Sequence, residues 1–395
     1  MLRLAEAADG LLARVRLPGG LIDGERLRVL ARLASELGDG RVELTSRGNV
    51  QLRGLAGDAA APLTDGLARA GLLPSFSHDR VRNVLASPLA GLDRGTDLTG
   101  IVRTLDAALC ARPRLAELSG RFLFAVDDGR GDVAGLGADV VATVRADSAV
   151  VNGLCVRRPD VADAAGTGAD GVPDRLRDDV VTAMLACAEA FLDLRAAHGG
   201  TAWRITDLPG GPGQIRTAVS ARLGLPEDRA EPAPATVTRP VGLVARQSGC
   251  GGRESAESVR DDPGLSVVLL APLGRLTAAQ LTWVAGQLGD RDARITPWRS
   301  VVLPRLDDAA GVLREAAGLG FGTDEASPWL RVTACAGRPG CASALADVQA
   351  DAAGFAARWP GRIVHVSGCG RHCGRPAATE IDVTATSKEY QVAGV

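Results

Sequence analysis

Apolar and polar positions alternate along the chain in a pattern that occurs twice. Residues 11–22 and 265–276 each form a short apolar stretch interrupted by a turn rich in Pro and Gly. Each is followed by a stretch in which apolar residues recur at every third or fourth position, over residues 25–37 and 277–288. A second short apolar stretch then follows in both places. This pattern predicts a β-α-β unit present in two copies.

The duplication extends beyond these units, because residues 83–88 align with 331–336, and residues 122–129 with 363–369. Residues 208–240 are rich in Pro, Gly and Ala, which is typical of a linker. We expect two similar halves with a site where they meet. The predicted segments are a half-domain at 1–62, an α/β lobe at 63–207 with a polar surface loop at 159–173 and a long amphipathic helix at 174–198, the linker at 208–240, a second half-domain at 241–308, and a C-terminal lobe at 309–395.

Charge and composition argue against several classes of function. The 395 residues carry 45 basic and 47 acidic side chains, a balance that lacks the overall positive charge of most nucleic-acid binders. Lys388 is the single lysine, so any anion site must use the planar forks of arginine, which suit carboxylates. The longest apolar stretches, such as residues 265–273, are too short to span a bilayer, and residues 1–10 do not resemble a signal peptide. We therefore expect a cytoplasmic protein.

Eight cysteines divide into two groups. Four are scattered, at positions typical of small buried apolar side chains: Cys110, Cys155, Cys187 and Cys250. The other four form a C-x5-C pair followed by a C-x3-C pair: Cys335, Cys341, Cys369 and Cys373. Two pairs of thiolates can hold an iron-sulfur cluster or a zinc ion, and the five-residue gap lies outside the usual zinc spacing. The spacing favours an iron-sulfur cluster, with zinc and a chance group of buried thiols as alternatives.

A row of polar residues follows the first helical stretch. On an extended strand, Thr45, Arg47, Asn49, Gln51 and Arg53 would point to one face, because side chains alternate with a period of two. Burying such a row without a ligand is costly, so it predicts an anion pocket, which further arginines nearby would strengthen: Arg80, Arg82 and Arg121. The alternative is the solvated face of an edge strand.

Together these motifs resemble the sirohaem-dependent nitrite and sulfite reductase superfamily. The resemblance rests on the duplicated unit, Thr45-Ser-Arg47-Gly-Asn49-Val-Gln51, the Arg82-Asn83 step and the cysteine pairs, and it covers nearly the whole chain. It implies an α+β fold, a duplicated nitrite/sulfite reductase-like architecture with ferredoxin-like half-domains and a C-terminal 4Fe-4S lobe. It also implies a cluster held by Cys335, Cys341, Cys369 and Cys373, and a tetrapyrrole pocket formed by Thr45, Arg47, Asn49, Gln51, Arg53, Arg82, Asn83 and Arg121.

Within the superfamily, residues 124–129 and 296–304 resemble the oxygen-dependent monooxygenases of aerobic cobalamin biosynthesis. The resemblance implies that precorrin-3A and O2 are the substrates, with hydroxylation at C20 and closure of a γ-lactone. The alternative is a sirohaem-dependent sulfite or nitrite reductase, in which a Lys-Phe-Lys motif helps bind the small oxyanion. The corresponding stretch here is residues 121–123, where Leu123 cannot donate a hydrogen bond, and this favours the monooxygenase. A non-catalytic electron carrier or tetrapyrrole-binding module is a third possibility.

The resemblance also implies a possible mononuclear non-haem iron, and sirohaem only under the reductase alternative. The candidate iron ligands are the four histidines, none of which the sequence singles out: His78, His198, His365 and His372. Asp127 and Asp128 could add oxygen ligands, although an Asp-Asp-Gly turn explains them equally well. The GxGxxG run at residues 166–171 falls within the predicted polar loop and does not directly follow a predicted strand, so we read no nucleotide-binding fingerprint there and expect electrons from a partner protein, a ferredoxin or a flavin reductase. No residue is assigned to catalysis.

Overall fold

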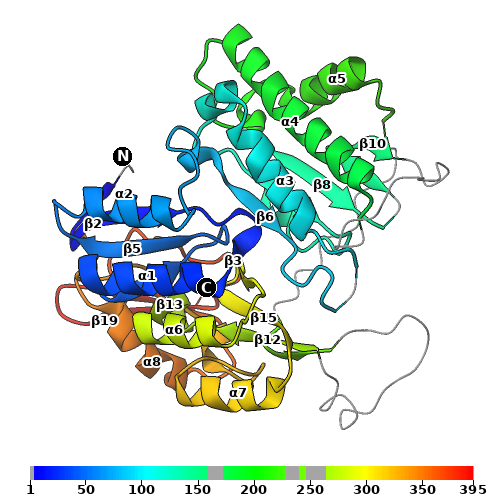
Figure 1. Cartoon of the computed structure of the whole chain (residues 1–395). Coiled ribbons are helices and arrows are strands. Elements are labelled where there is room, and N and C mark those ends of the chain that lie inside the picture. The colour runs from blue at the N-terminus through cyan, green and yellow to red at the C-terminus, as the bar shows by residue number, and fades with distance from the viewer. Residues whose placement is uncertain are drawn as a thin grey trace.

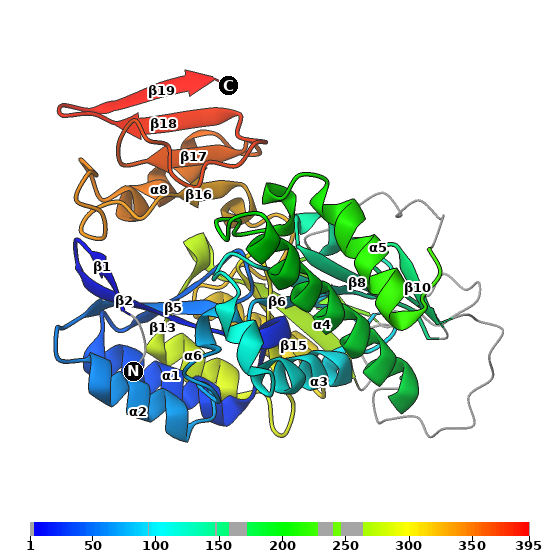
Figure 2. The ribbon, with the colours of Figure 1, turned by 90° about the horizontal axis from the view of Figure 1, so that it is seen from above.

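The computed structural model describes residues 4–93, 95–146, 148–157, 172–227, 240–245 and 264–394. Two similar half-domains lie against each other, with an α/β lobe to one side and a C-terminal lobe over the half-domain sheets (Figures 1 and 2). None of the helices in these ranges is long and apolar enough to cross a membrane.

The first half-domain is an antiparallel sheet covered by helices on one face. Its strands lie in the order β1 (Ala5–Ala7), β2 (Gly10–Val15), β5 (Val50–Leu55), β4 (Arg41–Leu44) and β13 (Arg275–Thr277), and its helices are α1 (Gly24–Leu37) and α2 (Ala60–Arg69). Helix α1 begins where the Asp23 carboxylate accepts a hydrogen bond from the backbone N–H of Arg26. Its apolar side, with Leu27, Leu30 and Leu33, is buried in the core, as its period of three and four predicts.

The second half-domain repeats this plan. Its strands lie in the order β11 (Gly242–Val244), β12 (Leu265–Leu270), β15 (Ser300–Leu306), β14 (Ala293–Ile295) and β3 (Leu21–Ile22), with helices α6 (Ala278–Gly286) and α7 (Ala309–Gly318). Each half lends one short strand to the other, since β13 pairs with β4 and β3 pairs with β14. One apolar core therefore runs through both halves, and the predicted duplication of the unit is confirmed.

The α/β lobe contains a five-stranded sheet packed on a long helix. Its strands are β6 (Val84–Ala86), β7 (Phe124–Asp127), β8 (Val140–Val144), β9 (Ala149–Val151) and β10 (Leu154–Arg157), and its helices are α3 (Thr99–Cys110), α4 (Asp174–Ala197) and α5 (Gly211–Leu223). Helix α4 is the predicted amphipathic helix, and its Phe191 ring packs against Phe122 in the core.

The predicted linker and the predicted polar loop both fall in this region. The linker prediction is wrong for residues 211–223, because these form α5, which packs against the α/β lobe through Ile215 and Val219. The Pro, Gly and Ala content of this stretch predicts a linker, but its Pro212 lies in the first helical turn, where Pro is well tolerated. Residues 228–239 of the predicted linker, and most of the predicted loop at 159–173, lie outside the described residues.

The C-terminal lobe repeats the parallel core of the α/β lobe. It contains β16 (Val332–Ala334), β17 (Val364–Ser367), β18 (Ile381–Ala385) and β19 (Tyr390–Gly394), with α8 (Val348–Arg358). Strands β16, β17 and β18 are parallel, as β6, β7 and β8 are. Carboxyl ends of parallel strands meet at one edge, so the loops after β16 and β17, which carry the paired cysteines, begin side by side.

Candidate functional site

Two matching turns lie at the centre of the molecule, one in each half-domain. The first joins β4 to β5, and the second joins β14 to β15. In the first, the backbone N–H of Thr45 donates to the carbonyl of Asn49, and Thr45 Oγ1 accepts from the N–H of Asn49. In the second, Thr296 and Ser300 make the same two contacts. The second turn is therefore the structural copy of the first.

This turn corrects the prediction of a single polar strand from Thr45 to Arg53. Residues 45–49 form the turn, and β5 begins only at Val50. Asn49 points inward and its Oδ1 accepts a hydrogen bond from the backbone N–H of Leu17 across 2.8 Å. The Thr-x-x-x-Asn spacing suits a turn in which the Thr hydroxyl bonds local N–H groups, and this local bonding prevails over strand alternation.

Four members of the predicted row nevertheless meet in one large cavity: Thr45, Arg47, Gln51 and Arg53. We call it the basic cavity, because six arginines and one glutamate line it: Arg14, Arg16, Arg47, Arg53, Arg121, Arg299 and Glu43. It encloses about 1720 Å³ of space, part of it open to solvent, and Cys335 and Cys373 reach its wall from the C-terminal lobe. The cavity thus joins the first half-domain, the α/β lobe and the cysteine loops.

The charges of the basic cavity are poorly balanced within the protein. Arg53 pairs with Asp9 across 2.9 Å, whereas the ion pairs made by the described residues include none of Arg14, Arg16, Arg47 and Arg121. Burial lowers the pKa of Arg16 to about 10, although Asp79 opposes the shift, and burial together with repulsion from Arg204 lowers the pKa of Arg47 despite the opposing effect of Asp139. A lowered arginine pKa means that the charged form lacks compensating negative charge, which a bound anion would supply.

Two loops place Arg47 and Arg121 at this cavity. The Arg47 guanidinium donates to the carbonyls of Gly120, across 3.0 Å, and Arg121. The Arg121 guanidinium lies over the Trp203 ring, 4.4 Å from its centroid. Asn83 fixes the same loop, because its Nδ2 donates to the carbonyls of Gly120 and Phe122.

Arg82 and Asn83 are therefore not brought into the basic cavity, contrary to the predicted pocket, and neither is Asn49. Arg82 makes a two-pronged ion pair with Asp106, both bonds at 2.7 Å, and lines a separate cavity. All three side chains are buried polar groups that satisfy other parts of the protein, a role that sequence pattern alone does not distinguish from ligand binding.

A second cavity adjoins the first, and sequence reasoning missed it. We call it the apolar cavity, because Leu89, Val268, Leu270, Trp298 and Trp329 line much of it. Ser46, Leu273, Arg299 and Gly374 line both cavities, so the two cavities share a wall. Alignment of residues 296–300 with residues 45–49 could have indicated this wall, since the second turn lies where the first does.

The polar end of the apolar cavity carries an acid–base pair, Arg130 and Asp132. The Ser87 hydroxyl donates to Asp132 across 2.6 Å, and Arg130 pairs with Asp93 and Asp128. Burial raises the pKa of Asp132 to about 6. This carboxyl can therefore hold or release a proton near neutral pH.

The four paired cysteines lie on neighbouring loops. Cys335 follows β16 and Cys369 follows β17, and the loops are joined by a hydrogen bond from the N–H of Leu345 to the carbonyl of Gly368. Thiols on Gly-rich loops have the donor chemistry of an iron-sulfur site. Within the described ranges, however, no three His, Cys, Asp or Glu side chains lie close enough to hold a metal ion. A cluster bound by all four thiols would require these loops to draw closer.

His78 and His198 bond groups of the α/β lobe, whereas His365 and His372 both lie near Asp382 in the C-terminal lobe. His78 bonds Ser75 and the carbonyl of Arg112, and His198 bonds the carbonyl of Leu194. His365 bonds Thr333, and His372 lies 2.9 Å from Asp382. The Asp127 carboxylate is occupied by backbone N–H groups, as the turn interpretation predicts. In the part of the chain that the structure describes, these residues do not assemble a mononuclear iron site.

Comparison with known proteins agrees with this architecture. Residues 4–70 match the nitrite/sulfite reductase ferredoxin-like half domain. The NirA protein of Mycobacterium tuberculosis superposes with a TM-score of 0.70 over 97% of this chain and 73% of that one, at 19% identity. The chain thus has a nitrite/sulfite reductase-like fold with a ferredoxin-like half-domain, and the expected fold class is confirmed.

The chain is also similar, over most of its length, to individual enzymes. The chain is 28% identical to a precorrin-3B synthase from Sinorhizobium sp, over 98% of this chain and 79% of the relative. It is 25% identical to a ferredoxin–nitrite reductase from Leptolyngbya laminosa, over 95% of this chain and 76% of that protein. The resemblance to precorrin-3B synthase and to its superfamily is confirmed, and both kinds of relative are oxidoreductases.

Proposed function

We propose that this protein is a precorrin-3B synthase, an O2-dependent monooxygenase that hydroxylates precorrin-3A at C20 and closes a γ-lactone in aerobic cobalamin biosynthesis. The observation that carries the proposal is the basic cavity, where Arg14, Arg16, Arg47 and Arg121 belong to none of the ion pairs made by the described residues, and which adjoins an apolar cavity. Similarity to a precorrin-3B synthase over nearly the whole chain supports the particular reaction.

Precorrin-3A fits the two cavities by its chemistry. It carries carboxylates around an apolar macrocycle, and arginine forks can bind those carboxylates while apolar walls contact the rings. Binding would also supply the negative charge that the lowered pKa values of Arg16 and Arg47 indicate is missing. From the predicted set, Thr45, Arg47, Gln51, Arg53 and Arg121 remain the proposed contacts.

Electrons would enter through the C-terminal lobe. Cys335, Cys341, Cys369 and Cys373 have the thiol chemistry for a 4Fe-4S cluster, which when bound supplies electrons one at a time. Cys335 and Cys373 already lie on the wall of the basic cavity, so the distance from cluster to substrate would be short. We infer a ferredoxin or flavin reductase as donor, consistent with relatives that are named ferredoxin–nitrite reductases.

The reaction requires two electrons and two protons. One atom of O2 enters C20 as a hydroxyl group, and the other leaves as water. A carboxyl such as Asp132, buried at the end of the apolar cavity, is placed to provide one of those protons.

The alternative is a sirohaem-dependent sulfite or nitrite reductase, favoured by the nitrite reductases among the relatives. Against it, Leu123 lies in an apolar cluster with Leu85 and Ala125 and does not line the basic cavity. A donor to a small oxyanion is therefore missing at this position, and Arg121 would have to act without it.

The deciding experiment uses 18O2. Reduced protein with precorrin-3A should give a product with one heavy oxygen at C20, detected by mass spectrometry. Reduction of sulfite or nitrite by the purified protein would favour the reductase, and C20 oxygen derived from water alone would exclude an O2-dependent monooxygenase; either result would overturn the proposal.

A further inference from the structure

The fourth residue of the two matching turns has the same unusual backbone in both copies. Gly48 has a φ of 63° in the first turn, and Arg299 has a φ of 63° in the second. Glycine adopts this left-handed conformation freely, whereas in other L-residues the Cβ crowds the following carbonyl oxygen. The second turn therefore holds a strained arginine where its copy has the residue that avoids strain.

The surroundings explain why the first turn uses glycine. A Cβ on Gly48 would lie only 3.1 Å from the carbonyl oxygen of Ile295, so a side chain there would press against the other half-domain. The corresponding side chain of the second turn instead lies on the wall that the two cavities share, because Arg299 lines both.

The neighbouring loop is shaped to let the Arg299 side chain pass. A Cβ on Gly274 would lie 2.6 Å from Cδ and 3.0 Å from Cγ of Arg299, so the arginine stem lies flat on the Gly274 backbone. Gly274 itself has a φ of 78°, and Leu273 before it has a φ of 54° where the first copy has Gly19. The positive φ values of Leu273 and Gly274 thus shape the loop along which the Arg299 side chain extends to the wall shared by the two cavities.

Arg299 is the charged member of the four residues that line both cavities. Backbone strain at a cavity wall is a reason to expect a ligand-binding role, since strain without function is readily lost by substitution. We propose that the left-handed backbone of Arg299 positions its guanidinium to bind a peripheral carboxylate where the tetrapyrrole passes from the basic to the apolar cavity. This inference rests on the proposed tetrapyrrole function.

The test compares Arg299→Ala with Arg299→Gly in the full-length protein. Both variants lose the guanidinium, so both should bind the stable polycarboxylate uroporphyrin III about tenfold to a hundredfold more weakly, measured by fluorescence titration. Only glycine relieves the strain, so Arg299→Gly should unfold about 1 to 2 °C above Arg299→Ala. The affinity lost and the stability recovered are thus separate readouts.

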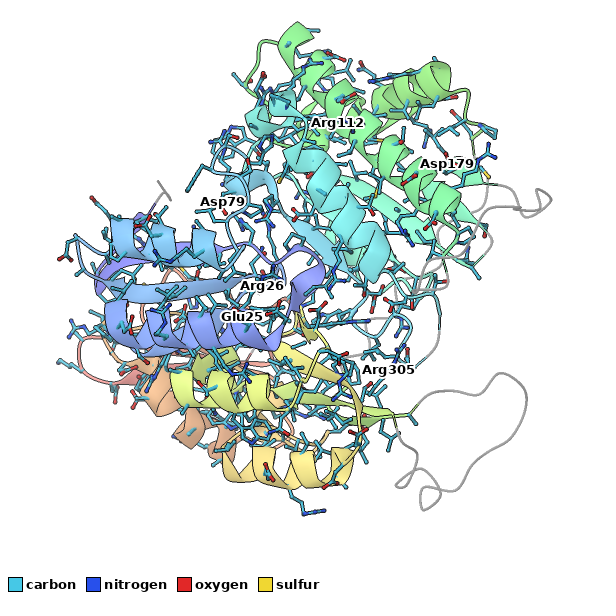
Figure 3. The ribbon with its side chains drawn as sticks, viewed as in Figure 1. Glu25, Arg26, Asp79, Arg112, Asp179 and Arg305 are labelled. Carbon is cyan, nitrogen blue, oxygen red and sulfur yellow. The ribbon has the colours of Figure 1, made fainter. Side chains whose placement is uncertain are left out.

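Arg305 offers a matched control. It lies in the same half-domain with a φ of 50°, is exposed, and reaches toward the α/β lobe outside both cavities (Figure 3). Arg305→Gly should likewise unfold above Arg305→Ala, with uroporphyrin affinity unchanged in both.

The possible results distinguish the proposed role of Arg299 from the proposed function of the protein. Unchanged affinity in the Arg299 variants, with wild-type protein binding well, would overturn the inference and leave the proposed function standing. Equal affinity loss in the Arg305 variants would overturn it too, because the effect would then be general charge. Failure of wild-type protein to bind uroporphyrin III and precorrin-3A would refute the proposed function and the inference together.

Discussion

The backbone N–H of Gly368 donates a hydrogen bond to Sγ of Cys335 across 3.1 Å. This bond joins the end of β17 to the first of the paired cysteines, and N–H groups directed at sulfur stabilise thiolate charge. We expect Cys335→Ser to lose the broad visible absorbance of an iron-sulfur cluster in anaerobically purified protein, together with much of the stability of the C-terminal lobe.

Cys110→Ser is the control for that experiment. Cys110 lies at the end of α3, near Arg82 and far from the cysteine loops in sequence and in the fold. Its replacement should leave the absorbance unchanged. Equal loss in both variants, or a cluster retained in Cys335→Ser, would contradict the assignment of the four paired cysteines.

A second prediction concerns Arg47. Removing its guanidinium with Arg47→Ala should weaken uroporphyrin III binding by about 1.5 to 3 kcal/mol, or roughly tenfold to a hundredfold, because a charge-assisted hydrogen bond is lost. The cluster absorbance should be unaffected, since Arg47 bonds the loop at Gly120 and not the cysteine loops.

The matched variant is Arg32→Ala on the exposed side of α1, where Arg32 pairs with Glu36. It removes the same charge outside the cavity and should leave the affinity unchanged. Should Arg47→Ala also bind normally, the arginines of the basic cavity would be solvated side chains and not ligand contacts.

Asn49 provides a third test, one of stability. Its Oδ1 satisfies the buried N–H of Leu17, so Asn49→Ala should lower the free energy of unfolding by about 1 to 3 kcal/mol in urea titrations. Ser46→Ala in the same turn removes an exposed side chain and should cost less than about 0.5 kcal/mol. If Asn49→Ala instead left stability intact and weakened porphyrin binding, the predicted ligand role of Asn49 would be restored.

The sequence predicted the repeated units well because each is built from local periodicity. The apolar faces of α1 and α6 recur every three or four residues, and a Pro/Gly turn precedes each helix. The exchange of β3 and β13 between the halves was not predictable in this way, because strands of two or three residues carry little pattern. Their pairing depends on the two halves already being packed together.

Only part of the candidate site was predictable from the sequence, because contacts that form only in the fold leave no local pattern. Arg47, Arg53 and Arg121, which residue type singled out because arginines are costly to bury, do line the basic cavity. Residue type could not distinguish them from Arg82, whose partner Asp106 is 24 residues away and becomes adjacent only in the fold. The apolar cavity was missed because Trp298 and Trp329 look like ordinary core residues until the lobes meet.

The last prediction follows from Asp132 at the end of the apolar cavity. Burial raises its pKa from 3.8 to about 6; Asp127 and Asp128 also raise it, while the Ser87 hydrogen bond and Arg130 oppose the shift. The folded protein therefore holds a proton on Asp132 between about pH 4 and pH 6, where the unfolded chain has released it. Stability from this group is present at acidic pH and is lost as the pH rises through about 6.

Asp132→Asn cannot ionise and keeps an oxygen to accept the Ser87 hydrogen bond. It should therefore unfold at higher urea concentration than wild type at pH 7.5, by about 1 to 3 kcal/mol, and this difference should narrow to about a third near pH 4.5. Asp58→Asn, at an exposed position, should follow the wild-type curve at both pH values. If Asp132→Asn kept the wild-type dependence on pH, Asp132 would be ionised throughout, and it could not serve as the proton source of the apolar cavity.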